Sequence, residues 1–239
     1  MSFLKNLGQQ TNDIQEEEDS LGGGARDTAV YDCTIKSAYL GVSQGGANSV
    51  TIVAKDKNSS HEFRETLWVT NKKGEPFYVY NNEKRFLPGY NVANAIAGLA
   101  AGVGLADLET EEKTLQIYDF DEKKELPTEV ECLVELHGCD IAFGIIKEVQ
   151  DKTKKNDSTG NYEPTGETRE VNVIDKVFHA EAGVTLAEAK AGIEEGAFIE
   201  KWKTKWEGQT RNKAKGVAGA GKAGAPGAAS TPKKSLFKK

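Results

Sequence analysis

The chain has 239 residues, a formal net charge of -6 at neutral pH and 38% hydrophobic residues. This length suits one large domain with appendages, and no apolar stretch approaches the roughly 20 residues that span a bilayer. The N-terminus shows neither the basic nor the apolar segment of a signal peptide, so the sequence predicts a cytoplasmic protein without membrane association.

Charge is unevenly distributed along the chain. From Lys205 to the end there are nine basic residues and one acid, a net charge of +8, and the rest of the chain carries -14. A body this acidic argues against a duplex-DNA binder that works through bulk charge. Any nucleic-acid site on it is expected to be a local groove.

Both ends of the chain have compositions typical of disorder. Residues 1–26 contain an acidic run from Asp13 to Asp19 and predict a flexible N-terminal segment, either a solvated leader or an acidic mimic that shields a basic groove. Residues 208–239 predict a disordered Gly/Ala/Lys linker and a basic C-terminal tail, because they contain almost no aromatic or branched apolar side chains that a core could bury. The folded domain is predicted at 27–207.

The folded part is rich in predicted strands. Residues 29–40 alternate, with Cys33 and Ile35 on one face and Thr34 and Lys36 on the other. Further strands are predicted at residues 49–55, 62–70, 74–80, 113–120, 129–138, 140–151 and 168–180.

Two helices interrupt or follow these strands. Residues 91–103 place apolar side chains at helical spacing (Val92, Ile96, Leu99 and Val103), and residues 185–206 predict a C-terminal helix. A charged loop, 152–167, joins the last two strands. Strands with one helix inserted midway predict a mainly β fold: an OB-fold-like barrel with insertions, one internal helix and a C-terminal helix.

Catalytic motifs are lacking. The chain has three histidines and no spaced metal-binding pair, nucleophile elbow or phosphate-binding loop. Cys132, His137 and Cys139, with Cys33 as a fourth ligand, allow a metal hypothesis, but the alternation of Cys132 with apolar residues favours a buried thiol. The sequence therefore predicts a protein that is not an enzyme, with no metal and no cofactor.

Residues 61–90 interleave aromatic with basic side chains. A protein that binds single-stranded nucleic acid requires this combination, because flat rings stack on unpaired bases and basic side chains contact the phosphates. Alternation in the strand 62–70 predicts Phe63, Leu67 and Val69 as core residues. It leaves Arg64, Thr66 and Trp68 on the solvent or ligand face.

The next strand extends the same face. Phe77 and Val79 are predicted to point inward, and Tyr78 and Tyr80 outward. The candidate DNA-binding residues are Arg64, Trp68, Lys72, Lys73, Tyr78, Tyr80, Lys84 and Arg85, joined by Lys152, Lys154, Lys155 and Tyr162 of the charged loop. The alternative is that the aromatic residues only cap a rim in a β-rich structural or assembly module that binds no nucleic acid.

At this point the chain resembles the phage-encoded single-stranded-DNA-binding proteins. The resemblance rests on LWVTNKKGEPFYVY (67–80), the Pro-Gly turn at 88–89 and the helix that begins NVANAI, and it spans residues 27–206 in the order of the elements. It implies an OB-fold and sequence-nonspecific binding of single-stranded DNA, in phage replication and recombination inside an infected bacterial cell. By position it implies stacking on Trp68, Tyr78 and Tyr80, and phosphate contacts from Arg64, Lys72 and Lys73.

The end of the chain departs from the acidic tail of many replication-type binding proteins. Its lysine-rich end resembles that of the lytic podovirus branch, whose single-strand binder also activates the host RNA polymerase through its C-terminus. An apolar pair between lysines on a long tether suits docking on a protein, so replication or recombination proteins or the host RNA polymerase are the expected partners. The predicted partner-binding residues are Lys233, Lys234, Leu236, Phe237, Lys238 and Lys239.

Overall fold

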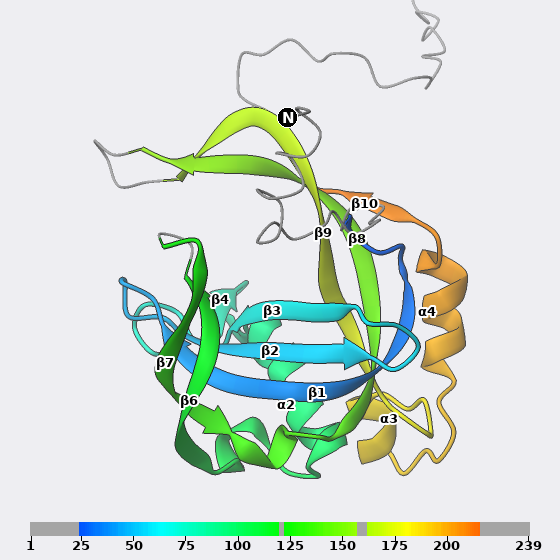
Figure 1. The fold of residues 1–239 in the computed structure, drawn as a ribbon. Helices are drawn as coiled ribbons and strands as arrows, with labels where there is room; N and C mark the ends of the chain where they lie inside the picture. Colours follow the sequence, from blue (N-terminus) through cyan, green and yellow to red (C-terminus); the bar gives the residue numbers. More distant parts are fainter. Residues whose placement is uncertain (1–23, 120–121, 157–161, 216–239) are drawn as a thin grey trace, which may run out of the picture.

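The computed structural model describes residues 24–119, 122–156 and 162–215, and the fold is mainly β, as the sequence predicts (Figure 1). The strands are β1 (Ala29–Val42), β2 (Asn48–Asp56), β3 (Glu62–Trp68), β4 (Phe77–Tyr80), β5 (Glu83–Phe86), β6 (Thr110–Asp119), β7 (Lys124–Leu133), β8 (Asp140–Lys155), β9 (Tyr162–His179) and β10 (Thr210–Asn212). The helices are α2 (Pro88–Ala100), α3 (Leu186–Lys190) and α4 (Phe198–Trp206), with short 3₁₀ turns at Leu105–Asp107 and Val134–Leu136. In the described ranges, no helix is both long and apolar enough to cross a membrane.

Five strands form the central curved sheet, in the spatial order β3-β2-β1-β8-β9. All of these neighbours are antiparallel. The β6–β7 hairpin joins β1 through the pair Tyr39 and Cys132, and the short β10 lies parallel to β8. The β4–β5 hairpin forms a separate two-stranded sheet.

The two end strands of this sheet, β3 and β9, face each other across an open seam. Within the described residues no backbone ladder joins them, so the sheet is not closed into a barrel. One side chain spans the seam: the Glu65 carboxylate accepts a hydrogen bond of 2.5 Å from the backbone N–H of Ile174.

The main core lies between the sheet and α2. Cys33 and Ile35 of β1 and Phe63 and Leu67 of β3 are buried, which confirms the predicted inner faces of both strands. Helix α2 begins at Pro88, earlier than predicted, because proline suits the first helical position. It ends before Val103, because Gly102 adopts a left-handed φ of 75°.

A second, smaller core lies on the other side of β8 and β9, under α4 (Figure 1). Its centre is Trp202, which fits against Gly144 of β8; a Cβ at Gly144 would come 3.0 Å from the indole ring. The predicted single helix 185–206 is wrong, since α3 and α4 are separate. Gly192 has a φ of 73°, and a Cβ at Gly196 would overlap the carbonyl of Gly183, so the chain turns between the two helices.

The structure also corrects the predicted ends of the hairpin and of the domain. Strands β8 and β9 continue through most of the expected loop 152–167, because two polar strands can pair with each other in solvent. They form a ribbon that extends away from the body (Figure 1). Within the expected linker 208–239, Thr210–Asn212 forms β10, so the fold reaches further than residue 207.

Candidate nucleic-acid interface

The outer face of β3 carries the aromatic platform that the sequence predicts. Trp68 is 47% exposed and Arg64 is exposed, whereas Phe63 and Leu67 point into the core. Thr66 shares the outer face and makes a 3.0 Å hydroxyl contact with Thr51 of β2. The alternation of side chains along the strand thus places Trp68 at the surface, at the end of β3.

A cleft of about 710 Å³ opens beside Trp68, between the end of β3, the β4–β5 hairpin, the start of α2 and strand β9. The aromatic side chains that line it are Trp68, Tyr78 and Phe86, and the basic ones are Lys176, Arg211 and Lys213. Tyr78 is 44% exposed and Phe86 51% exposed. The cleft therefore presents open ring faces together with positive charge.

Two local structures hold the aromatic walls of the cleft in place. Gly89 in the first turn of α2 lies directly against the backbone of Trp68, where a Cβ would overlap the Trp68 carbonyl oxygen and come 2.8 Å from its nitrogen. Asn71 builds the turn that leads to the hairpin, because its carboxamide oxygen accepts from the backbone N–H groups of Lys73 and Glu75. The first contact requires a residue without a side chain at Gly89, and the second requires the side-chain oxygen of Asn71.

The N-terminus of α2 forms one end of the cleft, through Leu87, Pro88 and Gly89. Leu87 provides no side-chain cap, and the first turn contains no acidic residue. No carboxylate of the helix's own first turn therefore offsets the positive end of its dipole. This position adds to the positive character of the cleft beside Trp68.

An ion cluster forms the opposite wall. Arg211 donates to the buried Glu148 and, at 2.8 Å, to Asp175, and Lys213 lies 2.9 Å from Glu148. Burial works against the charged form of Glu148, but hydrogen bonds from Lys213, Gln150 and Arg211 hold its pKa below the ordinary value. Both acids are thereby compensated, and Lys213 is still 55% exposed toward the cleft.

The structure brings together only some of the predicted DNA-binding residues. Trp68 and Tyr78 line one cleft, and Lys72 lies nearby in the following turn, where its stem packs against Gly45. Lys73 occupies the same turn and is exposed. Arg64 shares the face of Trp68 but lies outside the cleft, donating to the hydroxyl of Tyr39 at 2.7 Å.

Three further candidates lie on the β4–β5 hairpin and outside the lining of the cleft. Lys84 lies 4.3 Å from the ring centroid of Phe77, and Arg85 lies 5.1 Å from that of Tyr80. The prediction that Val79 points inward is wrong, since Val79 is 61% exposed. The reason is that the hairpin is not part of the central sheet and has no core face.

The other candidates are remote or outside the described residues. Lys152, Lys154 and Tyr162 lie on the β8–β9 ribbon, where Lys152 pairs with Glu167 at 2.9 Å, and the backbone of Lys155 pairs with that of Tyr162. They do not line the cleft. The predicted partner-binding residues, Lys233, Lys234, Leu236, Phe237, Lys238 and Lys239, lie outside the described residues.

Sequence reasoning missed Lys176, Arg211 and Lys213 as part of the site. Arg211 and Lys213 fall in a segment whose composition indicates a linker, and Lys176 is one charge in an alternating strand. Phe86 could have been identified from the sequence, because it belongs to the stretch 61–90 in which aromatic and basic residues are interleaved. The buried thiol predicted for Cys132 is confirmed, and the described residues contain no group of three or more side chains placed to hold a metal ion.

No protein-family model matches the chain, and no curated protein matches it in sequence.

Proposed function

We propose that this protein binds single-stranded DNA without sequence preference, in the cleft beside Trp68. The observation that carries the proposal is the meeting of exposed Trp68 and Tyr78 with Lys176, Arg211 and Lys213 around one cleft. Stacking of a base on such a ring contributes about 1–3 kcal/mol, and it tolerates any base because every base has a flat face. Duplex DNA hides these faces, so single strands are the favoured ligand.

The order of the strands supports an OB-type scaffold. We propose that β1, β2, β3, β8 and β9 correspond to the five strands of an OB-fold, with α2 between the third and fourth, and that the β4–β5 and β6–β7 hairpins are insertions. OB-folds bind oligonucleotides on their second and third strands and adjoining loops. The position of Trp68 at the end of β3 agrees with that use.

The acidic net charge of the protein does not exclude this function. Among the residues that line the cleft, Asp175 is held by Arg211 and by the indole N–H of Trp202 at 2.9 Å. The amino group of Lys176 forms no ion pair among the described residues and is available to phosphates, and Lys213, although paired with Glu148, is 55% exposed. Because binding then releases counterions, affinity should fall as the salt concentration rises.

We further propose a role in phage DNA replication and recombination, with the C-terminal residues 233–239 as the segment that engages a protein partner. Replication or recombination proteins and the host RNA polymerase are the candidate partners. The support is the basic, Leu-Phe-containing sequence of this segment and the resemblance stated above.

Fluorescence anisotropy with a labelled oligothymidine, over a range of salt concentrations, tests the proposal. Trp68→Ala and Tyr78→Ala should each weaken binding about ten- to a hundredfold, because each removes one stacking surface. Lys176→Ala should lower the slope of log affinity against log salt by about 0.7. Ile193→Ala, an exposed apolar residue outside the cleft, is the matched control.

Two results would contradict the proposal: no binding by the wild-type protein at low salt, or equal binding by Trp68→Ala and the wild type. Indifference to DNA together with binding of a protein partner would favour the alternative, a β-rich interaction module.

A further inference from the structure

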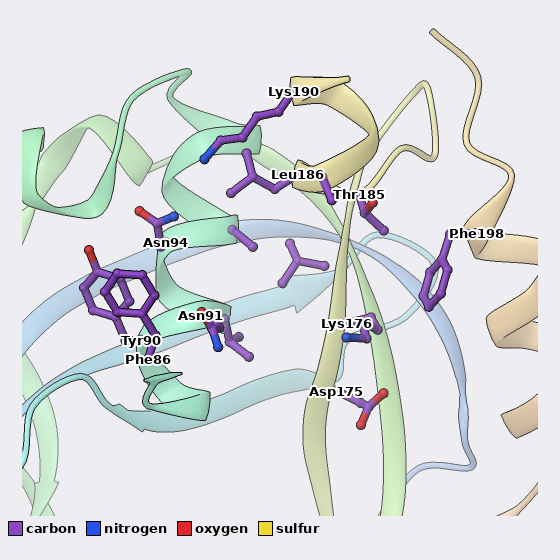
Figure 2. Close-up of a pocket in the computed structure, with 14 residues that line it drawn as sticks. Phe86, Tyr90, Asn91, Asn94, Asp175, Lys176, Thr185, Leu186, Lys190 and Phe198 are labelled. Carbon is purple, nitrogen blue, oxygen red and sulfur yellow. The ribbon is translucent and has the colours of Figure 1, made fainter. Parts of the chain in front are cut away.

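A second cavity, of about 530 Å³, adjoins the cleft on the far side of Phe86. Its walls are α2, the strand β9 around Lys176, and the start of α3, and it ends at Phe198 of α4 (Figure 2). Phe86, Asn91 and Lys176 line both the cleft and this cavity. The two spaces therefore adjoin each other, and the volume of the second lies in the range of small-ligand pockets.

Aromatic rings stand at both ends of the second cavity. Phe86 and Tyr90 stack with their centroids 4.6 Å apart and their planes at 15° (Figure 2). Phe86 is 51% exposed, so this pair offers its open side to a ligand. Phe198 lies at the opposite end and is 37% exposed. Leu186 and Val92 line the space between the rings. A flat, largely apolar group suits such a space.

The charge around this cavity is positive. Lys176 and Lys190 are exposed at its edge, and neither forms an ion pair with another residue in the described part of the chain. The one acid of the lining, Asp175, is already bound by Arg211 and Trp202. The Lys176 ammonium lies 5.9 Å from the ring centroid of Phe198. Lysines without ion pairs beside an aromatic, apolar space suit a ligand that combines a flat ring with phosphates.

One polar side chain stands where the two spaces meet. The carboxamide of Asn91 is exposed on the first turns of α2 and has no hydrogen-bond partner among the described residues. It presents a donor and an acceptor, which the edge of an unpaired base can satisfy. The junction thus offers a ring face from Phe86, a polar edge contact from Asn91 and a cation from Lys176.

Resting on the proposed function, we infer that a bound single strand passes Phe86 and places one further base in this second cavity, with Lys176 and Lys190 on the flanking phosphates. The base stacks against the aromatic rings and its edge meets Asn91. The cleft and the second cavity act as successive base-binding subsites. Binding strength then depends on whether the oligonucleotide is long enough to fill both.

Oligothymidines of increasing length test this inference with variants of residues that line the second cavity and do not line the cleft. Phe198→Ala and Lys190→Glu should each weaken binding of long oligonucleotides about tenfold. Neither should change binding of the shortest oligonucleotide that the wild-type protein holds. Ile193→Ala and Lys201→Glu, at exposed positions outside both spaces, are the matched controls. Thermal unfolding of each variant shows whether the fold is retained.

Photo-crosslinking provides a second readout that does not depend on the variants. An oligonucleotide carrying 5-iodo-deoxyuridine should crosslink to Tyr90 or Phe198 as well as to Trp68 or Tyr78.

If the wild-type protein binds single strands but both variants bind all lengths normally and no crosslink reaches Tyr90 or Phe198, the inference is wrong and the proposed function stands. If the wild-type protein binds no single strand, the proposed function itself fails. If a peptide of residues 216–239 crosslinks at Phe198 and the oligonucleotide does not, the cavity is a peptide site and the inference is wrong.

Discussion

The Glu65 carboxylate and the Ile174 backbone N–H are joined by a 2.5 Å hydrogen bond across the open seam between β3 and β9. Burial raises the pKa of Glu65 to about 7, against the lowering effect of this hydrogen bond. Glu65 also lines the cleft that holds Trp68. One titrating side chain therefore links the two edges of the sheet at the candidate binding site.

This relationship predicts a pH-dependent stability. In the unfolded chain the pKa of Glu65 is near 4.5, so between about pH 4.5 and 7 the folded protein binds more protons than the unfolded one. The contribution of Glu65 to the free energy of unfolding should thus fall as the pH rises through this window. Glu65→Gln should remove that fall and stabilise the protein by about 1–3 kcal/mol at pH 8.

Urea denaturation of both proteins at several pH values measures this effect. Glu62→Gln, an exposed carboxylate on the same strand, is the control and should show no such difference. If the stability difference between Glu65→Gln and the wild type is constant from about pH 4 to pH 8, the pKa of Glu65 is not raised in the folded protein.

The buried Glu148 predicts a large cost for the loss of Arg211. Arg211→Ala would leave Glu148 with Lys213 and Gln150 alone, and Asp175 with only the indole N–H of Trp202. Because an uncompensated buried charge is costly, the free energy of unfolding should drop by about 2–4 kcal/mol. Lys203→Ala, which breaks the exposed pair with Glu200, should cost less than about 1 kcal/mol. Chemical denaturation compares the two, and equal losses would show that the cluster does not hold β10 in place.

Gly89 predicts a steric effect on the binding site. In Gly89→Ala the added methyl group meets the backbone of Trp68, so α2 has to move away from β3. Overpacking of this kind destabilises a protein by about 1–3 kcal/mol, and the displacement should also weaken oligothymidine binding. Gly24→Ala has open space around the new methyl group and should change neither property. A Gly89→Ala protein with wild-type melting temperature and affinity would contradict the proposed contact.

The C-terminal tail predicts a separation of two activities. Removal of residues 233–239 should leave the affinity for oligothymidine largely intact, because the exposed Lys176 and Lys213 line the cleft without the tail. The same deletion should abolish the contact with a protein partner, measured as binding to the host RNA polymerase or to replication proteins. A large loss of DNA affinity on deletion would place the tail in the DNA site instead.

The parts of the fold that were predictable are those that depend on neighbours in sequence. Alternation along β1 and β3 identifies Cys33, Ile35, Phe63 and Leu67 as core residues, and the same alternation exposes Trp68. The break between α3 and α4 was not predictable from an Ala- and Glu-rich segment. It depends on a close approach between Gly196 and Gly183, which only the folded backbone reveals.

The candidate site shows the same division. Trp68 and Tyr78 lie ten residues apart and were found from local pattern, but Lys176 and Arg211 reach the cleft from β9 and β10, which are distant along the chain. Strand β10 has no apolar pattern of its own, and its pairing with β8 is held by the ions around Glu148. The place of Lys176 and Arg211 in the cleft can be recognised only once the strand order is known.

Tryptophan fluorescence during titration with poly(dT) at low salt tests the central claim most directly. The wild-type emission should be quenched, because a base stacks on Trp68. The other two tryptophans do not line the cleft: Trp202 is buried, and Trp206 is half-buried beside Arg211. Trp68→Phe should lose most of the quenching while anisotropy still shows weakened binding. No change in the wild-type emission, or the same quenching in Trp68→Phe, would contradict the claim that the cleft beside Trp68 holds the single strand.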